Sequence, residues 1–269
     1  MNYRHAFHAG NFADCFKHSI LVWCLAALQR KPAGVFVLDT HAGAGRYDLG
    51  ADPARRTGEA RDGIFRLLDN PPLALLDYVA LAARDLYPGS PALIRAMLRQ
   101  QDRLACCELH PEDAALLRRR FFRDPQTAVH LRDGYEAIGA LLPPASLRRA
   151  LVLIDPPYEA PDEAARVAQA IRVAHERMPG ATTLAWYPIK HRAPVRALHA
   201  DIAVPDAVAV EFWLREPLDP ARLNGCGLVV VNPPFGFATE LEPILSALLS
   251  RLGNRDPGEG KRIVRLTAE

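Results

Sequence analysis

The chain has 269 residues, of which 49% are hydrophobic, and carries a formal net charge of +2. This length is enough for one α/β domain with an insertion and a sizeable buried core. The small net charge does not by itself indicate a nucleic-acid-binding protein. No apolar stretch reaches the ~20 residues that a membrane-spanning helix needs, and the first residues lack the pattern of a signal peptide. We therefore expect a cytoplasmic protein.

The cysteines and histidines show no metal-binding pattern. The five cysteines form no Cys-x-x-Cys pair and fall mostly within apolar runs, which indicates buried thiols in a reducing compartment. The nine histidines are scattered without the spacing of zinc ligands. We therefore expect no metal site.

Basic residues gather in three local groups, although the chain as a whole is nearly neutral. Such groups are usually solvated helix faces, and contact with a nucleic-acid backbone is the alternative. The groups are Arg55, Arg56 and Arg61; Arg118, Arg119, Arg120 and Arg123; and Lys190, His191, Arg192 and Arg196.

The hydrophobic pattern predicts an α/β fold in which helices alternate with buried strands. A helix is expected over residues 11–29. Seven strands are expected at residues 35–39, 104–108, 128–131, 151–155, 183–187, 209–214 and 228–232. Helical patterns between them cover residues 92–98, 111–121 and 162–177.

Residues 46–88 contain more chain than one crossover between strands needs. Within them, residues 58–68 and 73–86 are predicted to form two short helices. We predict a main domain formed by residues 1–45 and 89–269, with residues 46–88 as a small inserted helical subdomain. A role of this insertion as a lid or RNA-docking element and a purely structural excursion both stay open.

A glycine-rich turn follows the first predicted strand, with Gly43 and Gly45 in residues 38–45. Glycines can adopt the dihedral angles of a tight strand-to-helix turn and leave room for a nucleoside or amino-acid group against the main chain. The spacing does not match the dinucleotide pattern of three glycines, and no Walker lysine follows, so a pyrophosphate ligand is disfavoured. A glycine turn without any ligand is the alternative.

The segment Asp155-Pro156-Pro157-Tyr158 directly follows the apolar residues 151–154. An exocyclic amine such as N6 of adenine is a poor nucleophile because its lone pair is delocalised into the ring, so a site must accept hydrogen bonds from its two protons. Asp155 offers a carboxylate, the prolines offer carbonyls without N–H donors, and Tyr158 offers a ring on which an unstacked base can rest. The turn predicts chemistry on the amino group of a flat base, with Asp155, Pro156 and Tyr158 as catalytic residues. A turn that merely ends the strand is the alternative.

Acidic residues also end two further predicted strands. Glu108 follows residues 104–107, and Asp133-Gly134 follows residues 128–131. An acid at the end of the second strand of such a fold can bind both ribose hydroxyls of a nucleoside, and an acid after the third strand can accept from an adenine amino group. Each alone is more often an ordinary solvated residue, so the prediction rests on their order along the chain.

Several blocks of the sequence resemble one known family. They are Tyr3-Arg4-His5-Ala6-Phe7-His8-Ala9-Gly10-Asn11 with Asp14, Lys17 and His18; Asp39-Thr40-His41-Ala42-Gly43-Ala44-Gly45-Arg46-Tyr47; Tyr87-Pro88-Gly89-Ser90-Pro91; and Glu108-Leu109-His110-Pro111. Together with the Asp155 turn, they look like an S-adenosylmethionine-dependent methyltransferase of amino groups on nucleobases. More narrowly, nearly the whole chain is similar to the ribosomal RNA large subunit methyltransferase J family.

The resemblance implies a Rossmann-like class I methyltransferase fold with a seven-stranded sheet. It implies S-adenosyl-L-methionine as the cofactor and methylation of N6 of one adenine in 23S rRNA. The expected partner is therefore 23S rRNA, with no membrane and no obligate protein partner, and we expect a monomer.

The resemblance also implies roles for individual residues. Asp155 matches the catalytic acceptor, and Tyr3 matches a position implicated in substrate contact, to which we add Arg4 and Tyr158. The segment that carries Tyr3 and Arg4 would ordinarily be a frayed terminus, and folding over the active site is the alternative. The expected cofactor-binding residues are His18, His41, Gly43, Ser90, Glu108, Asp133, Gly134 and Asp155.

A second turn, Asn232-Pro233-Pro234-Phe235, matches the same motif. In the methyltransferase fold that the chain resembles, the last strand is antiparallel, so its C-terminal end lies opposite the ligand-binding edge. Ligands of such sheets bind outside the carboxyl ends of the parallel strands. We therefore predict that Asp155, not Asn232, is catalytic.

Two competing functions stay open. The same motif serves DNA adenine, cytosine N4 and protein glutamine methylation, although a DNA enzyme is expected to carry a separate base-reading domain and only a short tail follows residue 232. A non-catalytic RNA-binding or cofactor-sensing protein is the alternative from another class, and the presence of Asp155, Tyr158 and Glu108 argues against it.

Overall fold

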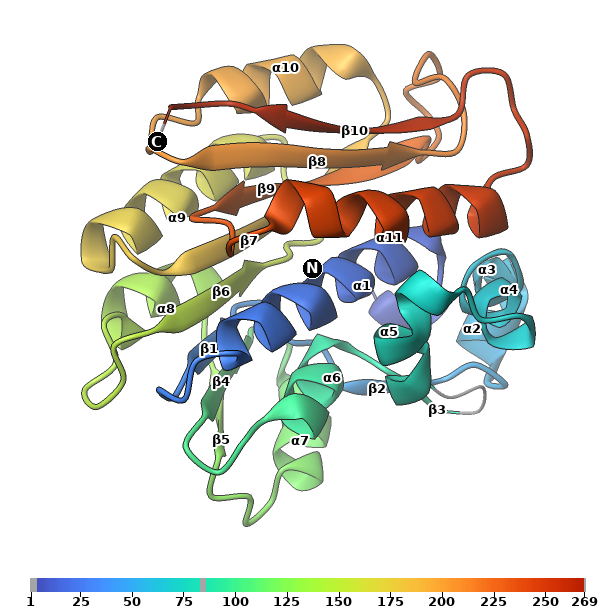
Figure 1. The fold of residues 1–269 in the computed structure, drawn as a ribbon. Coiled ribbons are helices and arrows are strands. Elements are labelled where there is room, and N and C mark those ends of the chain that lie inside the picture. The colour runs from blue at the N-terminus through green and yellow to red at the C-terminus, as the bar shows by residue number, and fades with distance from the viewer. Residues whose placement is uncertain (1–3, 83–85, 269) are drawn as a thin grey trace.

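The computed structural model describes residues 4–82 and 86–268, and an eight-stranded sheet forms its centre (Figure 1). The strand order is β10-β8-β9-β7-β6-β1-β4-β5. Five neighbouring strands, from β7 to β5, are parallel, β9 is antiparallel to both of its neighbours, and β10 is antiparallel to β8. The strands are β1 (Phe36–Asp39), β4 (Arg103–Glu108), β5 (Thr127–Leu131), β6 (Ala150–Ile154), β7 (Thr182–Ile189), β8 (Ala207–Trp213), β9 (Gly225–Val231) and β10 (Gly260–Arg265).

The predicted fold class is confirmed, but the main sheet has eight strands rather than the predicted seven. The additional strand, β10, lies at the sheet edge and is only partly buried, and Lys261, Arg262 and Arg265 interrupt its apolar pattern. It therefore lacked the apolar run by which the other strands were predicted. Its place is set by antiparallel pairing with β8, from Gly260 opposite Trp213 to Arg265 opposite Val208.

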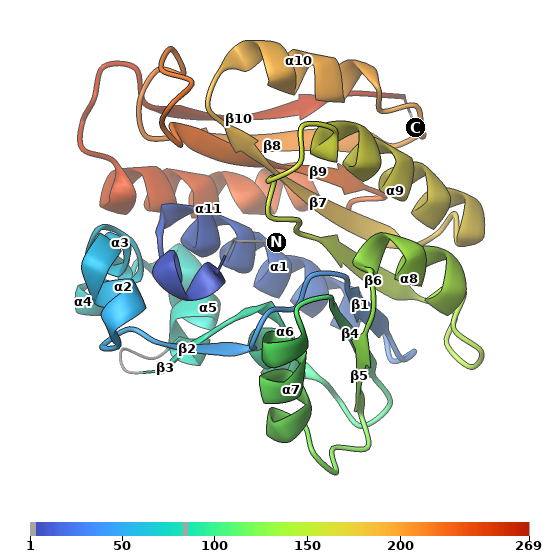
Figure 2. The ribbon, with the colours of Figure 1, turned by 180° about the vertical axis from the view of Figure 1, so that it is seen from behind.

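Helices cover both faces of the sheet and make a three-layer α/β/α sandwich (Figures 1 and 2). One buried apolar cluster joins the sheet to the first group of helices, and a second cluster joins the opposite face to the other group. The first group is α1 (Phe12–Gln29), α6 (Ser90–Met97), α7 (Pro111–Arg120) and α11 (Phe237–Leu252). The second group is α8 (Gly134–Leu141), α9 (Glu163–Arg177) and α10 (Arg192–Ala200).

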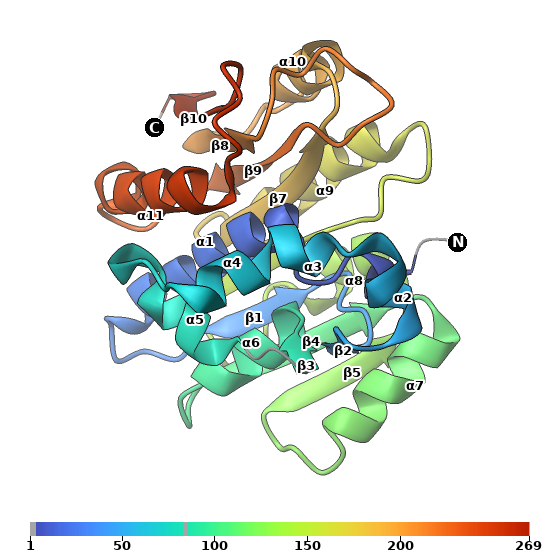
Figure 3. The same ribbon diagram turned by 90° about the vertical axis from the view of Figure 1, so that its right-hand side faces the viewer.

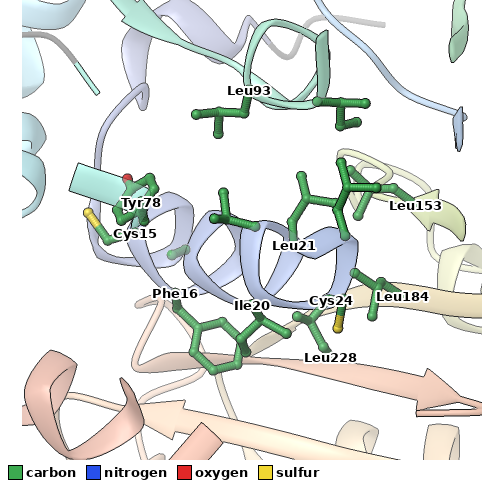
Figure 4. Close-up of a cluster of buried hydrophobic side chains, with 14 of the residues drawn as sticks. Cys15, Phe16, Ile20, Leu21, Cys24, Tyr78, Leu93, Leu153, Leu184 and Leu228 are labelled. Atoms are coloured by element: carbon green, nitrogen blue, oxygen red, sulfur yellow. The ribbon is translucent and has the colours of Figure 1, made fainter. Parts of the chain in front are cut away.

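Helix α1 is almost entirely buried between the strands and neighbouring helices. The side chain of Asn11 caps its first turn by accepting a hydrogen bond from the Asp14 amide (2.9 Å), which satisfies a helix-end donor. Figure 4 shows Phe16 and Ile20 on the side of Leu228, with Leu93 of α6 across the helix. This packing fixes the axial position of α1, and therefore the positions of the polar residues in its first two turns.

The insertion contains short helices framed by a small two-stranded sheet (Figure 3). Its elements are β2 (Arg46–Asp48), α2 (Asp52–Thr57), α3 (Glu59–Asp62), α4 (Ile64–Asp69), η2 (Leu73–Leu75), α5 (Leu76–Leu81) and β3 (Leu86–Pro88). The pairing of β2 with β3 was not predicted, and the helix expected up to residue 86 ends at Leu81. The division into a main domain and an inserted subdomain stays a prediction.

The N-terminal segment lies against this insertion. It forms the short helix η1 (His5–Phe7), and the Phe7 carbonyl accepts a hydrogen bond from Thr57 (2.5 Å). Glu59 accepts from the Asn11 side chain (3.0 Å) and contacts Nδ1 of His8 (2.9 Å). The described part of the terminus is therefore tied to α2 and α3.

The five cysteines are all buried and form no disulfide, as the sequence predicted.

Candidate active site

A cavity of about 900 Å³ lies at the edge of the sheet where the parallel strands end. It is bordered by α1, by the turns after β1, β4, β5, β6 and β7, and by part of the insertion. Ten residues predicted from the sequence line this one cavity: His18, His41, Gly43, Ser90, Glu108, Asp133, Gly134, Asp155, Pro156 and Tyr158.

The glycine-rich turn has a conformation that requires glycine. Gly43 and Gly45 have φ angles of 60° and 79°, in the left-handed region. A Cβ atom at Gly43 would lie 2.1 Å from the hydroxyl oxygen of Tyr47. The Gly43 amide donates a hydrogen bond to Oε2 of Glu108 (2.7 Å), so the turn after β1 is held to the end of β4.

Glu108 is buried at the end of β4, and two backbone amides hold its carboxylate. Oε2 accepts from Gly43, and Oε1 accepts from the His110 amide (2.7 Å). Burial raises the pKa of Glu108, and these two hydrogen bonds partly oppose the rise. Each oxygen keeps a further lone pair, so the carboxylate can accept two hydroxyl groups from a vicinal diol.

Asp133 and Gly134 form the start of α8, next to the turn after β1. Oδ1 of Asp133 caps the helix by accepting from the Tyr135 amide (2.7 Å), and Oδ2 accepts from Arg166 (3.2 Å). A Cβ atom at Gly134 would lie 2.0 Å from the Thr40 carbonyl oxygen. Glycine thus allows α8 to approach β1 closely, and Asp133 already has structural partners within the protein.

A buried pair, Asp39 and Ser90, lies beneath the cavity. Ser90 donates to Oδ2 of Asp39 (2.7 Å), whereas Oδ1 has no hydrogen-bond partner among the described residues. Burial raises the pKa of Asp39 to about 7, with the negative charge of Asp155 adding to the rise and Ser90 opposing it. The sequence had indicated Ser90 but not its partner.

Of the four histidines that line the cavity, the two predicted from the sequence, His18 and His41, are neutral near pH 7. Burial lowers the pKa of His18 to about 3, and Nδ1 of its ring contacts the Tyr87 hydroxyl (2.8 Å). Burial likewise lowers the pKa of His41 to about 4, and its Nδ1 contacts the Thr40 hydroxyl (2.7 Å). Both rings can therefore exchange neutral hydrogen bonds with a ligand and add no positive charge.

The Asp155 turn combines a carboxylate with two aromatic rings. Tyr158 has a φ angle of 52°, which is rare for a residue other than glycine, and its hydroxyl donates to the Trp186 carbonyl (3.1 Å). The Tyr158 and Trp186 rings meet edge to face, with centroids 5.7 Å apart. Both line the cavity, although the sequence analysis had not included Trp186 in the site.

Helix α1 supplies a charged group that the sequence analysis had not assigned to the site. The Lys17 ammonium hydrogen-bonds Oδ2 of Asp155 and lies 3.1 Å from Oδ1 of Asp14. Asp14 in turn contacts Nε2 of His5 (2.9 Å). Burial opposes the charge of Asp14, but the positive charges of His5 and Lys17 outweigh it and hold the pKa of Asp14 well below its usual range. His5, Asp14 and Lys17 occur together in the N-terminal block on which the family resemblance was based, and this was the only indication in the sequence that they belong to the site.

Of the two predicted N-terminal substrate residues, only Arg4 is described by the structure, and it is not among the residues that line the cavity. Arg4 forms an ion pair with Glu112 at the start of α7 (2.6 Å), and Tyr3 lies outside the described residues. Their roles in substrate contact stay predictions.

Asn232 lies at the opposite edge of the sheet, as expected for the end of the antiparallel strand β9. Its side-chain nitrogen Nδ2 donates to the carbonyls of Pro179 (2.6 Å) and Ala181 (2.8 Å), directly before β7 begins. The second Pro-Pro turn therefore connects β9 to helix α11, and its residues are not among those that line the cavity.

Among the residues that the structure describes, no three His, Cys, Asp or Glu side chains are grouped so that they could hold a metal ion. A search of the helices within residues 4–82 and 86–268 finds none with the length and apolar character needed to cross a membrane.

The sequence matches one protein-family model and two named proteins. The model of the family described as "Ribosomal RNA large subunit methyltransferase D, RlmJ" matches residues 32–265. Proteins named ribosomal RNA large subunit methyltransferase J from Escherichia coli and Haemophilus influenzae are 36% and 37% identical, each over 94% of both chains.

Two solved structures are also similar. A Legionella pneumophila protein is 32% identical, with a TM-score of 0.88 over 96% of this chain and 98% of that one. A probable spermidine synthase from Corynebacterium glutamicum, at 15% identity and a TM-score of 0.51, covers 95% of this chain and 79% of its own, and shares the fold alone. From the family match and the two sequence relatives, the chain belongs to the ribosomal RNA large subunit methyltransferase J family.

Proposed function

We propose that the protein transfers a methyl group from S-adenosyl-L-methionine to N6 of one adenine in 23S rRNA. The observation that carries this proposal is the Asp155 turn, which opens onto the same cavity as the Gly43 turn and Glu108. One part of the cavity therefore offers acceptors and a ring for a flat amino-bearing base, and the other offers a nucleoside site. The names of the two curated relatives support large-subunit rRNA as the substrate.

The residues fit S-adenosyl-L-methionine as the cofactor. The positive φ angle of Gly43 and the Tyr47 hydroxyl beside it leave no room for a side chain in the turn after β1, and the main chain of this turn lines the cavity where the ligand would bind. Glu108 would hold the ribose hydroxyls, and Asp133 and Gly134 would border the adenine ring. His18, His41 and Ser90 would surround the amino-acid end. The bound cofactor supplies an electrophilic methyl group on a sulfonium.

The protein would act on the adenine by positioning and hydrogen bonding. Asp155 and the Pro156 carbonyl would accept hydrogen bonds from the two N6 protons, which localises the nitrogen lone pair toward the methyl group. Lys17 holds one carboxylate oxygen of Asp155 and leaves the other for the amine. Tyr158 would stack on the base after it has left its own stack, and Trp186 supports the Tyr158 ring by packing against it edge to face.

Transfer of labelled methyl from S-adenosyl-L-methionine to unmodified 23S rRNA tests this proposal. We expect label in N6-methyladenosine and a loss of at least about 100-fold in kcat for Asp155→Ala, which removes an essential acceptor. Asn232→Ala is the matched control for the second Pro-Pro turn and should keep activity if its fold is intact by circular dichroism. Label on a DNA duplex alone, or full activity in Asp155→Ala, would contradict the proposal.

We propose that the protein acts as a monomer. Sedimentation of the active protein at assay concentration tests this, and activity confined to a dimer would contradict it.

A further inference from the structure

Charged side chains of opposite sign lie on the two sides of the Asp155 turn in the cavity lining. On the side of β4 and β5, the lining carboxylates are Glu108, Asp113 and Asp133. On the side of β7 and β8, the lining includes Lys190, which directly follows β7, and Arg215 and Arg222, which belong to the connection between β8 and β9. We call Lys190, Arg215 and Arg222 the basic rim. Because β6 and its Asp155 turn lie between these two sides, the basic rim borders the substrate side.

The basic rim differs from the other cations of the cavity in its partners. Lys17 pairs with Asp14 and Asp155, and Arg166 pairs with Asp133 and Glu163. Across the described residues, no carboxylate pairs with any member of the basic rim. Lys190 and Arg222 are exposed, and the recorded contact of the Arg215 side chain is a hydrogen bond to the Leu223 carbonyl (3.2 Å). Their charges are thus available to an anion at the cavity mouth.

A buried asparagine fixes the basic rim in place. The side-chain nitrogen of Asn224 donates to the carbonyls of Lys190 (2.7 Å) and Asp219 (2.8 Å). The Asn224 amide donates to the Ile189 carbonyl (3.0 Å), and its carbonyl accepts from the Leu214 amide (2.9 Å). These bonds join the end of β7 to both ends of the β8–β9 connection, so the backbone that carries the three cations is ordered before any ligand binds.

We propose that the basic rim binds the phosphates that flank the target adenine and holds the RNA strand at the cavity mouth. This inference rests on the proposed function and extends it to the recognition of the backbone. An adenine that enters the cavity brings its own phosphates to the mouth. The carboxylates of the β4–β5 side repel these phosphates, whereas the basic rim attracts them, so the charge distribution sets the side on which the strand passes.

Binding of unmodified 23S rRNA by a Lys190→Gln/Arg222→Gln variant tests the proposal. Each phosphate contact that is lost should reduce the slope of log K against log salt by about 1, so we expect a fall of about 2 for the double variant. RNA affinity should weaken by about tenfold or more near 0.1 M salt. The affinity for S-adenosyl-L-methionine and kcat at saturating RNA should stay within about twofold, because the rim touches neither the cofactor nor N6.

Two variants control for charge and position. Arg118→Gln/Arg119→Gln removes the same charge from the exposed face of α7, outside the cavity lining, and should keep the parent salt slope. Lys190→Arg/Arg222→Lys keeps both positive charges in place and should also keep the parent salt slope. A parent-like slope in Lys190→Gln/Arg222→Gln, or an equal loss in the α7 variant, would overturn the proposal.

The same assays separate this proposal from the proposed function. If the parent protein binds rRNA through the basic rim but transfers no methyl group, the proposed function fails and the rim assignment stands. If the parent protein transfers methyl groups and the Lys190→Gln/Arg222→Gln variant binds RNA as tightly as the parent, the rim assignment fails alone. If the parent protein binds no RNA, both fail.

Discussion

Lys17 connects helix α1 to the Asp155 turn through a buried ion pair. Its side chain is 6% exposed and that of Asp155 is 16% exposed. Removing one partner of such a pair leaves an uncompensated charge, which typically costs about 3–5 kcal/mol. We expect Lys17→Met to lower the free energy of unfolding by about 3 kcal/mol, measured by urea denaturation at pH 7. The Lys17→Met/Asp155→Asn variant removes both charges and should recover part of the loss; an equal loss in both variants would contradict the pairing.

The raised pKa of Asp39 should make the stability of the fold decrease as the pH rises. Between its usual pKa of 3.8 and its folded value of about 7, the unfolded chain loses the Asp39 proton while the folded chain keeps it. Stability from this group is therefore fully present below pH 3.8 and is lost as the pH rises through about 7. We expect Asp39→Asn to be more stable than the parent at pH 8 and nearly equal to it at pH 4.

Urea denaturation of the cofactor-free protein across this pH range measures the Asp39 effect. The stability difference between Asp39→Asn and the parent should grow up to about pH 7 and then stay constant. A difference that does not change with pH would mean that Asp39 is already ionised throughout. Ser90→Ala is the control, because it removes the hydrogen bond to Oδ2 and keeps the carboxyl group.

The sequence predicted which residues at the strand ends belong to the site, but it did not predict which side chains contact them. Asp155 and Glu108 were found because Asp155 directly follows the buried strand β6 and Glu108 ends the buried strand β4, and parallel strands bring their ends to one edge. Lys17 and Asp155 are 138 positions apart, so their contact needed the packing of α1. Trp186 was assigned only to a strand, because alternation along a strand does not reveal which ring faces a ligand.

At the scale of elements, the close approach of α8 to β1 depends on one glycine. A Cβ atom at Gly134 would lie 2.0 Å from the Thr40 carbonyl oxygen, so the helix or the turn must move. We expect Gly134→Ala to lower the free energy of unfolding by about 1–3 kcal/mol, as overpacking does. Thermal denaturation measures this loss, and weaker binding of S-adenosyl-L-methionine should accompany it because the turn holds Thr40 and His41.

Gly139 in the same helix is the matched control. A Cβ atom there meets only Val173, at 4.0 Å, which is ordinary contact. Gly139→Ala should therefore leave cofactor binding unchanged and stabilise α8 by roughly 0.5–1 kcal/mol, because alanine favours the helix. Equal effects of the two substitutions would show that the approach of α8 to β1 does not depend on Gly134.

Elements with a continuous apolar pattern were predicted well, and those stabilised by neighbours were not. Strand β6 is buried at all five positions and reads as a buried strand from its sequence alone. Strand β10 is mostly polar, and its conformation follows from pairing with β8. The β2–β3 pair has three residues in each strand, too few for a period to be recognised, so pairing across the insertion defines it.

For the whole molecule, the alternation of helices and strands predicted the α/β class because each buried strand must be covered on both faces. The strand order then places the proposed cofactor site and the proposed substrate side on opposite sides of the Asp155 turn. Strands β1, β4 and β5 lie on one side of the Asp155 turn, and most of the predicted cofactor residues end or follow them, whereas β7, β8 and β9 lie on the other side with Trp186 and the basic rim. The sequence predicted the first half in detail because its residues occur in short motifs.

Binding of the cofactor should stabilise the whole fold. A ligand that binds only the folded state at about 100 times its Kd stabilises it by about 2.7 kcal/mol. For a chain of this size, that free energy should raise the Tm by roughly 5–10 °C. We expect this rise in Tm with S-adenosyl-L-methionine in differential scanning calorimetry.

Glu108→Gln should lose most of this rise in Tm, because an amide cannot accept two ribose hydroxyls and would place N–H donors against the amides of Gly43 or His110. Glu136→Gln, an exposed position on α8, should keep the full rise. If both variants keep it, Glu108 does not bind the ribose and the nucleoside site must be sought elsewhere in the cavity.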